Sequence, residues 1–448
     1  MSPSLPSAHA TTTTTPETSA TTLTVDVLGR GGDGLAYDRD GCLTVVPGAL
    51  PGETVLARLD DLHMAPRRAT LLAVESASPE RVTPPCPLFA RCGGCAVQHL
   101  ALPAALNWKA ATVRQALAQA GFAETCEVSL SQAPAGARRR MDIGVRRTTQ
   151  GLTLGFHARG GDLLDVRHCL VLAPALDRLL TPLHDLMIRV RGLRRDGDVV
   201  VNLLDSGPDI LVRTDGALTV DDRALLAAFA RAHDIPRIAW APVDQREPAE
   251  IAAQIAPVRH RLAGHAVVPP PGAFLQATAD SEAAIRDAVL AMLPPRLAAR
   301  DEIIELYAGC GTLTFGLAER GRVLAVEGNP DAATCLKQAA GGLRISVLQR
   351  DLNRQPLMAR ELAAKPVVVL DPPRMGAGAQ MREIASGAPQ RVVYVSCNPQ
   401  ALTKDAALLK AAGYSLAALT IIDQFVWSAE VEAIALFTAP PAKRARRR

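Results

Sequence analysis

The second half of the sequence alternates between short apolar segments and segments of helical periodicity, and this order constrains the fold more than any other feature. It begins after three consecutive prolines and a glycine at 269–272, the clearest break in the chain. Strands and helices that alternate in this way form a mostly parallel, doubly wound sheet with helices on both faces. Strands are predicted at 302–307, 322–327, 344–349, 367–370 and 391–396, and helices at 280–292 and near 400–411, with further helices after the first two strands.

The first half divides into two regions with different patterns. Residues 22–78 form short alternating strands punctuated by Gly and Asp, which predicts a small closed β-barrel. The region that follows has an α+β pattern, with a helix over 105–120 and strands near 139–147, 152–157 and 197–203. We therefore expect an α/β protein with a barrel (22–78), a central α+β domain (79–268) and a Rossmann-like domain (269–440), between a disordered lead-in (1–21) and a basic tail (441–448).

The formal net charge of +4 is unevenly distributed along the chain. The tail carries five positive charges and no side-chain acid, so residues 1–442 have a net charge of −1. A nucleic-acid site must therefore be a local basic patch, because the body of the protein is not uniformly basic.

The sequence also limits the cellular location. It contains no stretch of 18 consecutive apolar residues, which a membrane-spanning helix requires. The first 21 residues contain no Lys or Arg, unlike a signal or transit peptide. We expect a cytoplasmic monomer without membrane association, in which the nine cysteines are thiols, metal ligands or nucleophiles instead of disulfides.

A cofactor site is predicted where the first strand of the doubly wound sheet ends. Residues 308–312 form a loop with two glycines, which let a ligand approach the backbone closely. Glu327 closes the next strand, 18 residues after Gly309, where a carboxylate can accept hydrogen bonds from both ribose hydroxyls. Because the full G-x-G-x-x-G motif is missing, S-adenosylmethionine is favoured over a dinucleotide. The alternative interpretation is an ordinary helix cap beside a surface acid.

Two later strands end in residues suited to catalysis. One is followed by Asp371-Pro-Pro-Arg374, in which the prolines make the loop rigid, and the next by Ser396-Cys397-Asn398-Pro399. A cysteine just before the first turn of a helix is expected to favour the thiolate form. The alternative is that Cys397 is a small buried apolar residue, and its position beside the predicted cofactor loop favours the nucleophile.

Three further cysteines, Cys86, Cys92 and Cys95, lie within one ten-residue segment that is rich in Pro and Gly. In a cytoplasmic chain such a cluster indicates a metal site. Its spacing alone is compatible with zinc or with an iron–sulfur cluster.

These motifs together resemble the S-adenosylmethionine-dependent RNA uracil-5-methyltransferases, in particular the type with an N-terminal TRAM barrel and a [4Fe–4S] cluster. The resemblance extends from about residue 22 over nearly the whole chain. It rests on DPPR (371–374), SCNP (396–399), LYAGCGT (306–312), Phe274-Leu275-Gln276 and Val431-Glu432.

The resemblance implies methyl transfer to C5 of a uridine through a covalent adduct at C6. Cys397 would be the nucleophile, and Glu432 would be the general base. Two positions depart from the family: Thr312 stands where Asn is frequent, and Glu430 stands where His usually precedes Val-Glu. Residues that align with cofactor contacts are Gln276, Tyr307, Thr312, Glu327 and Asp371.

The resemblance also implies the metal. The family pattern C-x5-C-G-G-C matches residues 86–95, and the distant fourth ligand would be Cys169. A [4Fe–4S] cluster is therefore preferred to zinc, with a role in folding the central domain and shaping an RNA surface, because the methyl-transfer mechanism needs no electron transfer.

A basic segment of the central domain is the candidate RNA contact. Five arginines lie within ten residues, opposed by one acid, and they align with an arginine-containing, RNA-contacting strand of the family. The alternative is a solvated strand edge. The arginines are Arg138, Arg139, Arg140, Arg146 and Arg147.

The resemblance favours 23S ribosomal RNA as the substrate, with transfer RNA as the alternative. RNA cytosine-5 methylation is disfavoured, because those enzymes resemble a design with a Cys in the acidic Pro loop, where this chain has Arg374. A non-catalytic RNA-binding protein on the same fold is the rival from another class, and the intact Cys397 and Glu432 argue against it.

Overall fold

A computed structural model describes residues 20–60, 64–123, 126–244 and 248–441. The predicted tail apart from its first residue, and the predicted lead-in apart from its last two, lie outside these ranges. The chain forms two compact units, Met1–Val82 and Thr83–Arg448, which are described separately. Among the described residues, no helix is both long and apolar enough to span a membrane.

The first unit is a closed five-stranded barrel, which confirms the barrel predicted for residues 22–78. Alternate strand residues such as Leu23, Val25 and Val55 fill its interior. The order around the barrel is β1 (Ala20–Leu28), β2 (Gly34–Tyr37), β3 (Leu43–Val46), β5 (Arg67–Ser76) and β4 (Thr54–Leu59).

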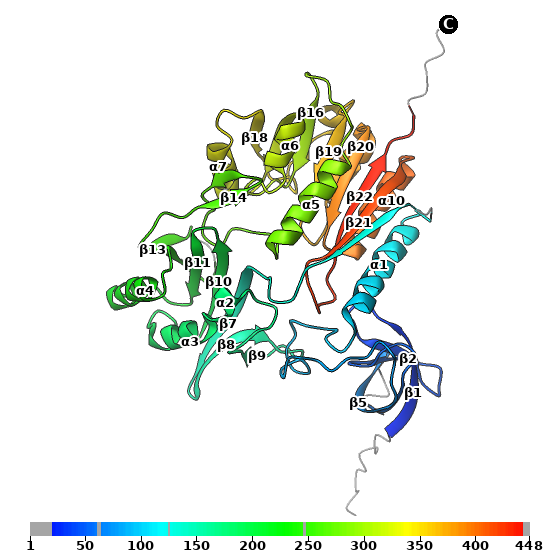
Figure 1. Cartoon of the computed structure of the whole chain (residues 1–448), viewed down its shortest axis with the longest axis vertical. Helices are drawn as coiled ribbons and strands as arrows, with labels where there is room; N and C mark the ends of the chain where they lie inside the picture. The colour runs from blue at the N-terminus through cyan, green and yellow to red at the C-terminus, as the bar shows by residue number, and fades with distance from the viewer. Residues whose placement is uncertain (1–19, 61–63, 124–125, 245–247, 442–448) are drawn as a thin grey trace, which may run out of the picture. The chain divides into compact units, whose positions relative to one another are not determined.

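The second unit contains two sheets. The C-terminal one has eight strands, and its five predicted parallel strands are confirmed to within a residue at each end (Figure 1). The three strands in the middle of this parallel set, Glu302–Leu306, Val367–Leu370 and Arg391–Ser396, are buried on both sides, as β-branched residues in a parallel sheet are expected to be. In sheet order the strands are β18 (Ile345–Gln349), β17 (Arg322–Glu327), β16 (Glu302–Leu306), β19 (Val367–Leu370), β20 (Arg391–Ser396), β22 (Glu432–Thr438), β21 (Ser415–Asp423) and β6 (Val128–Gln132).

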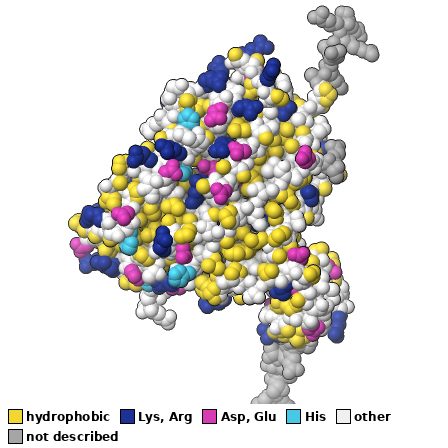
Figure 2. All heavy atoms as spheres, viewed as in Figure 1, with side chains coloured by type: hydrophobic (Ala, Val, Ile, Leu, Met, Phe, Trp, Pro, Cys, Tyr) yellow, Lys and Arg dark blue, Asp and Glu magenta, His cyan; other side chains and the backbone are white. Residues whose placement is uncertain are grey.

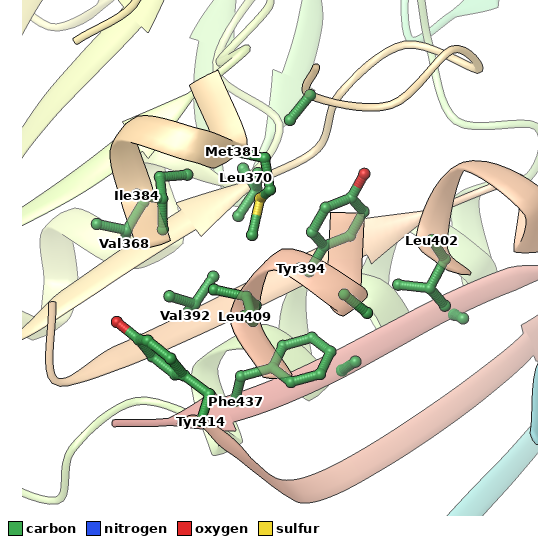
Figure 3. Packing of buried hydrophobic residues seen from close by; sticks show 14 of the residues in the cluster. Val368, Leu370, Met381, Ile384, Val392, Tyr394, Leu402, Leu409, Tyr414 and Phe437 are labelled. Carbon is green, nitrogen blue, oxygen red and sulfur yellow. The ribbon is translucent and has the colours of Figure 1, made fainter. Parts of the chain in front are cut away.

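Helices cover both faces of this sheet, as predicted. Alternate residues of each strand contribute to two separate cores, because successive side chains of a strand point to opposite faces. Figure 3 shows the first core, where Met381 and Ile384 of one helix meet Val368 and Tyr394 of the strands. The first core includes α1 (Leu102–Gln119), α9 (Ala379–Gly387) and α10 (Pro399–Ala411), and the second includes α5 (Ala279–Ala291), α6 (Thr314–Arg320) and α7 (Pro330–Ala339), while α8 (Ala359–Leu362) packs on α9.

The position of α1 and β6 differs from the predicted domain partition, which assigns 79–268 to the central domain. Helix α1 packs on α10, and β6 pairs with β21 at the edge of the C-terminal sheet. A buried ion pair fixes this arrangement: Nζ of Lys109 lies 2.5 Å from Oδ1 of Asp423. Local periodicity predicts the helix, but the sheet that it covers depends on this long-range contact.

The central sheet has seven strands, and helices cover one of its faces. Met141, Ile143 and Val145 point into the core under these helices, and the alternate residues face the other side. A hairpin of β14 (His260–Leu262) and β15 (His265–Val267) follows the sheet. The sheet order is β13 (Glu250–Gln254), β12 (Arg237–Pro242), β11 (Gly207–Thr214), β10 (Asp196–Leu204), β7 (Arg140–Thr148), β8 (Gly151–His157) and β9 (Leu163–Asp165), with α2 (Pro174–Asp177), α3 (Leu180–Arg189) and α4 (Val220–Ala232) on the covered face.

Candidate active site

The segments that carry the predicted site residues meet at one edge of the C-terminal sheet. Strands β16, β17, β19 and β20 are parallel neighbours, so the loops that follow them leave the sheet at the same edge. Strand β22 is antiparallel to β20 and begins where β20 ends. This topology brings to one edge the loop 308–312, Glu327, Asp371, Cys397 and Glu432.

The glycine loop turns beside Glu327. The N–H of Gly309 donates to Oε2 of Glu327 at 2.7 Å, and the N–H of Asn329 donates to Oε1 at 2.6 Å. A Cβ at Gly309 would meet nothing within 4 Å, whereas at Gly311, where φ is +105°, it would lie 2.6 Å from the Phe315 ring. Gly311 is therefore required by space and by backbone conformation. The loop borders open space at Gly309, next to a carboxylate with further lone pairs to offer.

The other two predicted residues of this loop flank the glycines. Tyr307 has a left-handed φ of +64°, a strained conformation of the kind found at functional sites. Its hydroxyl donates to the carbonyl of Ala377 at 3.5 Å, in the segment after β19. Thr312 is half-buried on the turn before α6. Both residues lie on the predicted loop, and Tyr307 also connects it to the neighbouring one.

A chain of side-chain hydrogen bonds joins three predicted site residues. Nε2 of Gln276 donates to Oδ2 of Asp371 at 3.3 Å. Nε2 of Gln424 donates to Oε1 of Gln276 at 2.9 Å and to Oε2 of Glu432 at 2.7 Å. Gln276, Gln424 and Glu432 are each only 3% exposed. The predicted cofactor contacts Gln276 and Asp371 and the predicted base Glu432 therefore belong to one buried network.

Burial keeps the carboxyl groups at this edge partly protonated. It raises the pKa of Asp371 to about 7 and that of Glu305, on β16, to about 8. Burial also raises the pKa of Glu432 well above its usual range, and the nearby Asp371 carboxylate adds to this effect. Because Asp371 interacts with both Glu305 and Glu432, the three carboxyl groups titrate as a coupled set with raised pKa values, and such groups can exchange protons with a substrate.

Cys397 is half-buried directly after β20. Burial raises its pKa to about 12, the carboxylates of Glu432 and Asp371 add to the rise, and Arg374 opposes it. Burial and the two acids therefore act against the thiolate form that the predicted position before a helix favours. The N-terminus itself is as predicted, because Asn398 caps α10 by accepting from Gln400 N–H at 3.0 Å.

The two acids near the start of β22 have different surroundings. Oε1 of Glu430 accepts from Nη2 of Arg374 at 2.7 Å at the protein surface. Glu432 is buried, and its Oε1 has no hydrogen-bond partner among the described residues. Glu432, not Glu430, therefore offers a buried acceptor at the edge where Cys397 lies.

The four predicted metal ligands line a single cavity. Cys86, Cys92, Cys95 and Cys169 form its wall together with apolar side chains such as Phe89. Among the described residues, no group of three or more His, Cys, Asp or Glu side chains is arranged to hold a metal ion. Cys169 therefore lines the same cavity as the other three cysteines, although it lies 74 residues beyond Cys95 in the sequence.

The cysteine loop contacts the segment that precedes Glu432. The N–H groups of Ala96 and Val97 both donate to the carbonyl of Trp427, at 2.7 and 2.9 Å. Trp427 itself has a left-handed φ of +64°. The residues directly after Cys95 therefore support the turn between β21 and β22.

The five arginines have different roles, which differs from the expectation of one phosphate-binding cluster. Arg139 is buried, pairs with Glu282 and donates to the carbonyl of Gln276 at 3.1 Å. Arg147 donates to main-chain carbonyls near the end of α3. The guanidinium N–H groups that donate to these acceptors inside the protein are not available to bind RNA phosphates.

The remaining three arginines differ in exposure: Arg138 and Arg140 are half-buried, whereas Arg146 is exposed and pairs with Asp196 at 2.8 Å. Arg140 and Arg146 lie on the face of the central sheet opposite to α3 and α4, and Arg140 stacks over the exposed ring of Phe274 at 5.3 Å. Arg138, half-buried, donates from Nε to the carbonyl of Arg140. Figure 2 shows basic side chains scattered among acidic ones on one face of the molecule.

Sequence reasoning missed two residues of the site. Gln424 contacts both Gln276 and Glu432, and Lys109 holds the neighbouring Asp423. Neither belongs to a motif, and their partners are distant in the sequence. The only signals in the sequence were the polar pair Asp423-Gln424 ahead of Val431-Glu432, and Lys109 in an otherwise apolar helix segment.

Comparison with known proteins gives consistent matches. Residues 349–439 match a family described as tRNA (uracil-5-)-methyltransferase. The chain is 38% identical to an uncharacterized RNA methyltransferase of Caulobacter vibrioides, over 93% of this chain and 99% of the relative. It is 33% identical to the 23S rRNA (uracil(1939)-C(5))-methyltransferase of Chromohalobacter salexigens, over 93% of this chain and 89% of the relative.

A solved structure has a similar fold. The tRNA (uracil-54, C5)-methyltransferase of Pyrococcus abyssi, in complex with S-adenosyl-L-homocysteine, superposes with a TM-score of 0.69. The match covers 93% of this chain and 99% of that one at 20% identity. At this identity the likeness shows a shared fold.

Proposed function

Because this chain belongs to the RNA uracil-5-methyltransferase family, we propose that it transfers a methyl group from S-adenosylmethionine to C5 of a uridine in RNA. The observation that carries the proposal is the meeting of Cys397, Asp371 and Glu432 at the sheet edge where the glycine loop and Glu327 lie. A nucleophile, a buried base and a cofactor loop are the three parts that the reaction requires.

The residues at this edge fit the cofactor. Glu327 would accept hydrogen bonds from the ribose hydroxyls, and the open space at Gly309 admits a ligand against the backbone. Gln276, Tyr307, Thr312 and Asp371 are the further proposed contacts. S-adenosylmethionine supplies a methyl group on a positively charged sulfur, and a positive charge here favours the ionised forms of the nearby thiol and carboxyls.

Cys397 would start the reaction as a thiolate. Its Sγ adds to C6 of uracil, and the electron pair of the C5=C6 bond moves into the ring as an enolate, so that C5 becomes nucleophilic. C5 then attacks the methyl carbon, and the methyl–sulfur bond breaks. Oε1 of Glu432 removes the proton from C5, the C5=C6 bond re-forms, and Sγ leaves.

Ribosomal RNA is the proposed substrate class. A relative that matches over nearly the full length is named for 23S rRNA, and transfer RNA is the alternative. Mapping 5-methyluridine in both RNAs from a strain that lacks the gene distinguishes them. Loss of one methylated uridine from 23S rRNA supports the proposal. A loss confined to transfer RNA would show that transfer RNA, and not ribosomal RNA, is the substrate. If both RNAs keep all their 5-methyluridine, the proposed function fails.

The cysteine cavity is proposed to hold a [4Fe–4S] cluster. Four thiolates from two distant segments can each bind one iron atom, and the apolar wall suits such a cluster. Zinc is the less favoured occupant, because a single ion needs all its ligands within about 2.3 Å of one point. The cluster would hold the loop that supports Trp427.

Protein purified without oxygen is expected to be brown and to contain about four iron atoms per chain. Cys169→Ser is expected to lose most of the iron and the visible absorbance, and to unfold at a lower temperature, because a ligand of the cluster is missing. Iron analysis and visible spectra measure the first effect, and calorimetry the second. Cys126→Ser, outside the cavity, is the control. A colourless anaerobic preparation with zinc and no iron would contradict the assignment.

The proposed RNA contacts are Arg138, Arg140 and Arg146. Replacing Arg140 and Arg146 together by Ala is expected to weaken RNA binding and to lower the salt slope of log K by about one to two, since fewer counterions are released. Arg189→Ala, an exposed residue of α3 on the covered side of the sheet, is the control. Filter binding between low and high salt measures the slope. An unchanged slope would remove these arginines from the RNA interface.

A further inference from the structure

Gln424 occupies a special place in the buried network. Its side chain follows β21 and lies between the proposed cofactor contact Gln276 and the proposed base Glu432. Its amide nitrogen has two N–H groups, one of which donates to Oε1 of Gln276 and the other to Oε2 of Glu432. The carbonyl oxygen of the same amide accepts from the N–H of Ala277 at 3.0 Å. Both donors and one acceptor position of the amide are therefore used within the protein.

The orientation of this amide is fixed by chemistry. The main-chain N–H of Ala277 can only donate, so the atom that faces it must be the carbonyl oxygen of Gln424. The amide nitrogen must then face Gln276 and Glu432. By the same logic, Oε1 of Gln276 accepts from Gln424, and its nitrogen is turned toward Asp371. The amide of Gln424 thus sets the direction of the Gln276 amide and donates to Glu432.

The main chain around Gln424 is also held. Nζ of the buried Lys109 lies 2.5 Å from Oδ1 of Asp423 and donates to the carbonyl of Phe425 at 3.0 Å. Gln132 donates to the second oxygen of Asp423 at 3.0 Å. The residues on both sides of Gln424 are therefore fixed to α1, while Gln424 itself reaches toward the reacting edge.

We propose that Gln424 is a positioning residue of the methyl transfer, which ties the cofactor contact Gln276 to the base Glu432 and leaves one base oxygen, Oε1, directed at the substrate. The inference rests on the proposed function and adds a residue that no motif marks. It explains why Oε2 of Glu432 is occupied, while Oε1 has no partner among the described residues.

The proposal has an electrostatic consequence. The N–H of Gln424 stabilises the ionised form of Glu432 and so lowers its pKa, against burial and the charges of Asp371 and Glu430, which raise it. Cys397 and Arg374 also act on this set, and Glu305 interacts with Asp371. Without the amide, Glu432 would hold its proton up to a higher pH, and less of it would be available as a base at neutral pH.

The test is Gln424→Met, which keeps the length of the side chain and removes its hydrogen bonds. Rapid quenching separates the formation of the protein–RNA adduct from its release. Release is expected to be about ten- to a hundredfold slower at pH 7, the size of a hydrogen bond to a charged group, and its pH midpoint is expected to rise by about one to two units. Adduct formation should slow less.

Two further variants complete the test. Gln338→Met, exposed on α7, is the matched control and should leave both steps and the pH midpoint unchanged. If Gln424→Met does not fold, Gln424→Glu takes its place: it keeps an acceptor for Ala277, but when ionised it has no donor for Glu432. The same upward shift of the pH midpoint is expected.

Slowing of both steps by the same factor, with an unchanged pH midpoint, would overturn the proposal and leave Gln424 a purely structural residue. Failure of the proposed function is a different result: the wild-type protein would then form neither an adduct nor 5-methyluridine. The wild type is therefore measured first on the same RNA.

Discussion

Cys397→Ala is expected to abolish methyl transfer, with a loss of at least about 10⁴-fold in turnover. Without a sulfur to add at C6, C5 of uracil remains a poor nucleophile toward the methyl group. The other thiol on a loop at this sheet edge, Cys310, is buried beside Cys335. Binding of S-adenosylhomocysteine should stay within a few-fold of wild type, because Glu327 and the glycine loop are untouched. Turnover is measured with labelled cofactor, and binding by calorimetry.

The matched control is Cys126→Ala, since Cys126 is half-buried and distant in sequence from the catalytic loops. It should retain near wild-type activity. A fully active Cys397→Ala protein would contradict the covalent mechanism. If cofactor binding were lost together with activity, Cys397 would be required for binding, and a direct role in the chemistry would not follow.

Glu432→Gln is expected to stop the reaction after methyl transfer. The substitution keeps the shape of the side chain, but an amide cannot take the C5 proton, so that Sγ cannot leave. Release is expected to fall by about 10²- to 10⁴-fold, with a methylated protein–RNA adduct that survives denaturing electrophoresis. Radioactivity from the labelled methyl group, carried with the protein band, measures this adduct.

The pH dependence of release follows from the same acid. Glu432 acts only when ionised, and its pKa is raised by burial and by Asp371, whose own pKa is about 7. Release in the wild type should therefore increase with pH well above the usual range of a carboxyl group, with a midpoint that belongs to the coupled pair. Glu430→Gln, which removes only the partner of Arg374, is the control. If the adduct accumulated in Glu430→Gln and not in Glu432→Gln, Glu430 would be the general base in place of Glu432.

The sequence predicted most of the C-terminal sheet, because its signals are local. Buried parallel strands are continuous Val- and Ile-rich runs, as in Val367–Leu370, and Pro399 after Asn398 marks the start of a helix. The ends of these strands also located the site. Parallel strands direct their loops to one edge, so Asp371 and Cys397 could be placed together before any coordinates.

What the sequence could not predict depends on contacts between distant segments. Helix α1 joins the C-terminal sheet through Lys109 and Asp423, which lie 314 residues apart. Arg139 looks like a phosphate ligand in the sequence, but it is buried against Glu282. The protonation of Cys397 likewise depends on two acids from other strands. A single sequence does not show which of its distant residues come into contact in the folded chain.

The most direct test of the account uses RNA that carries 5-fluorouridine at the methylated position. Fluorine cannot be removed from C5 as a proton is, so the adduct formed after methyl transfer cannot be released. The account predicts a stable, methylated protein–RNA complex, in which peptide mapping by mass spectrometry places the nucleotide on Cys397. Adduct at another cysteine, or methylation of normal RNA with no adduct on the fluorinated one, would contradict it.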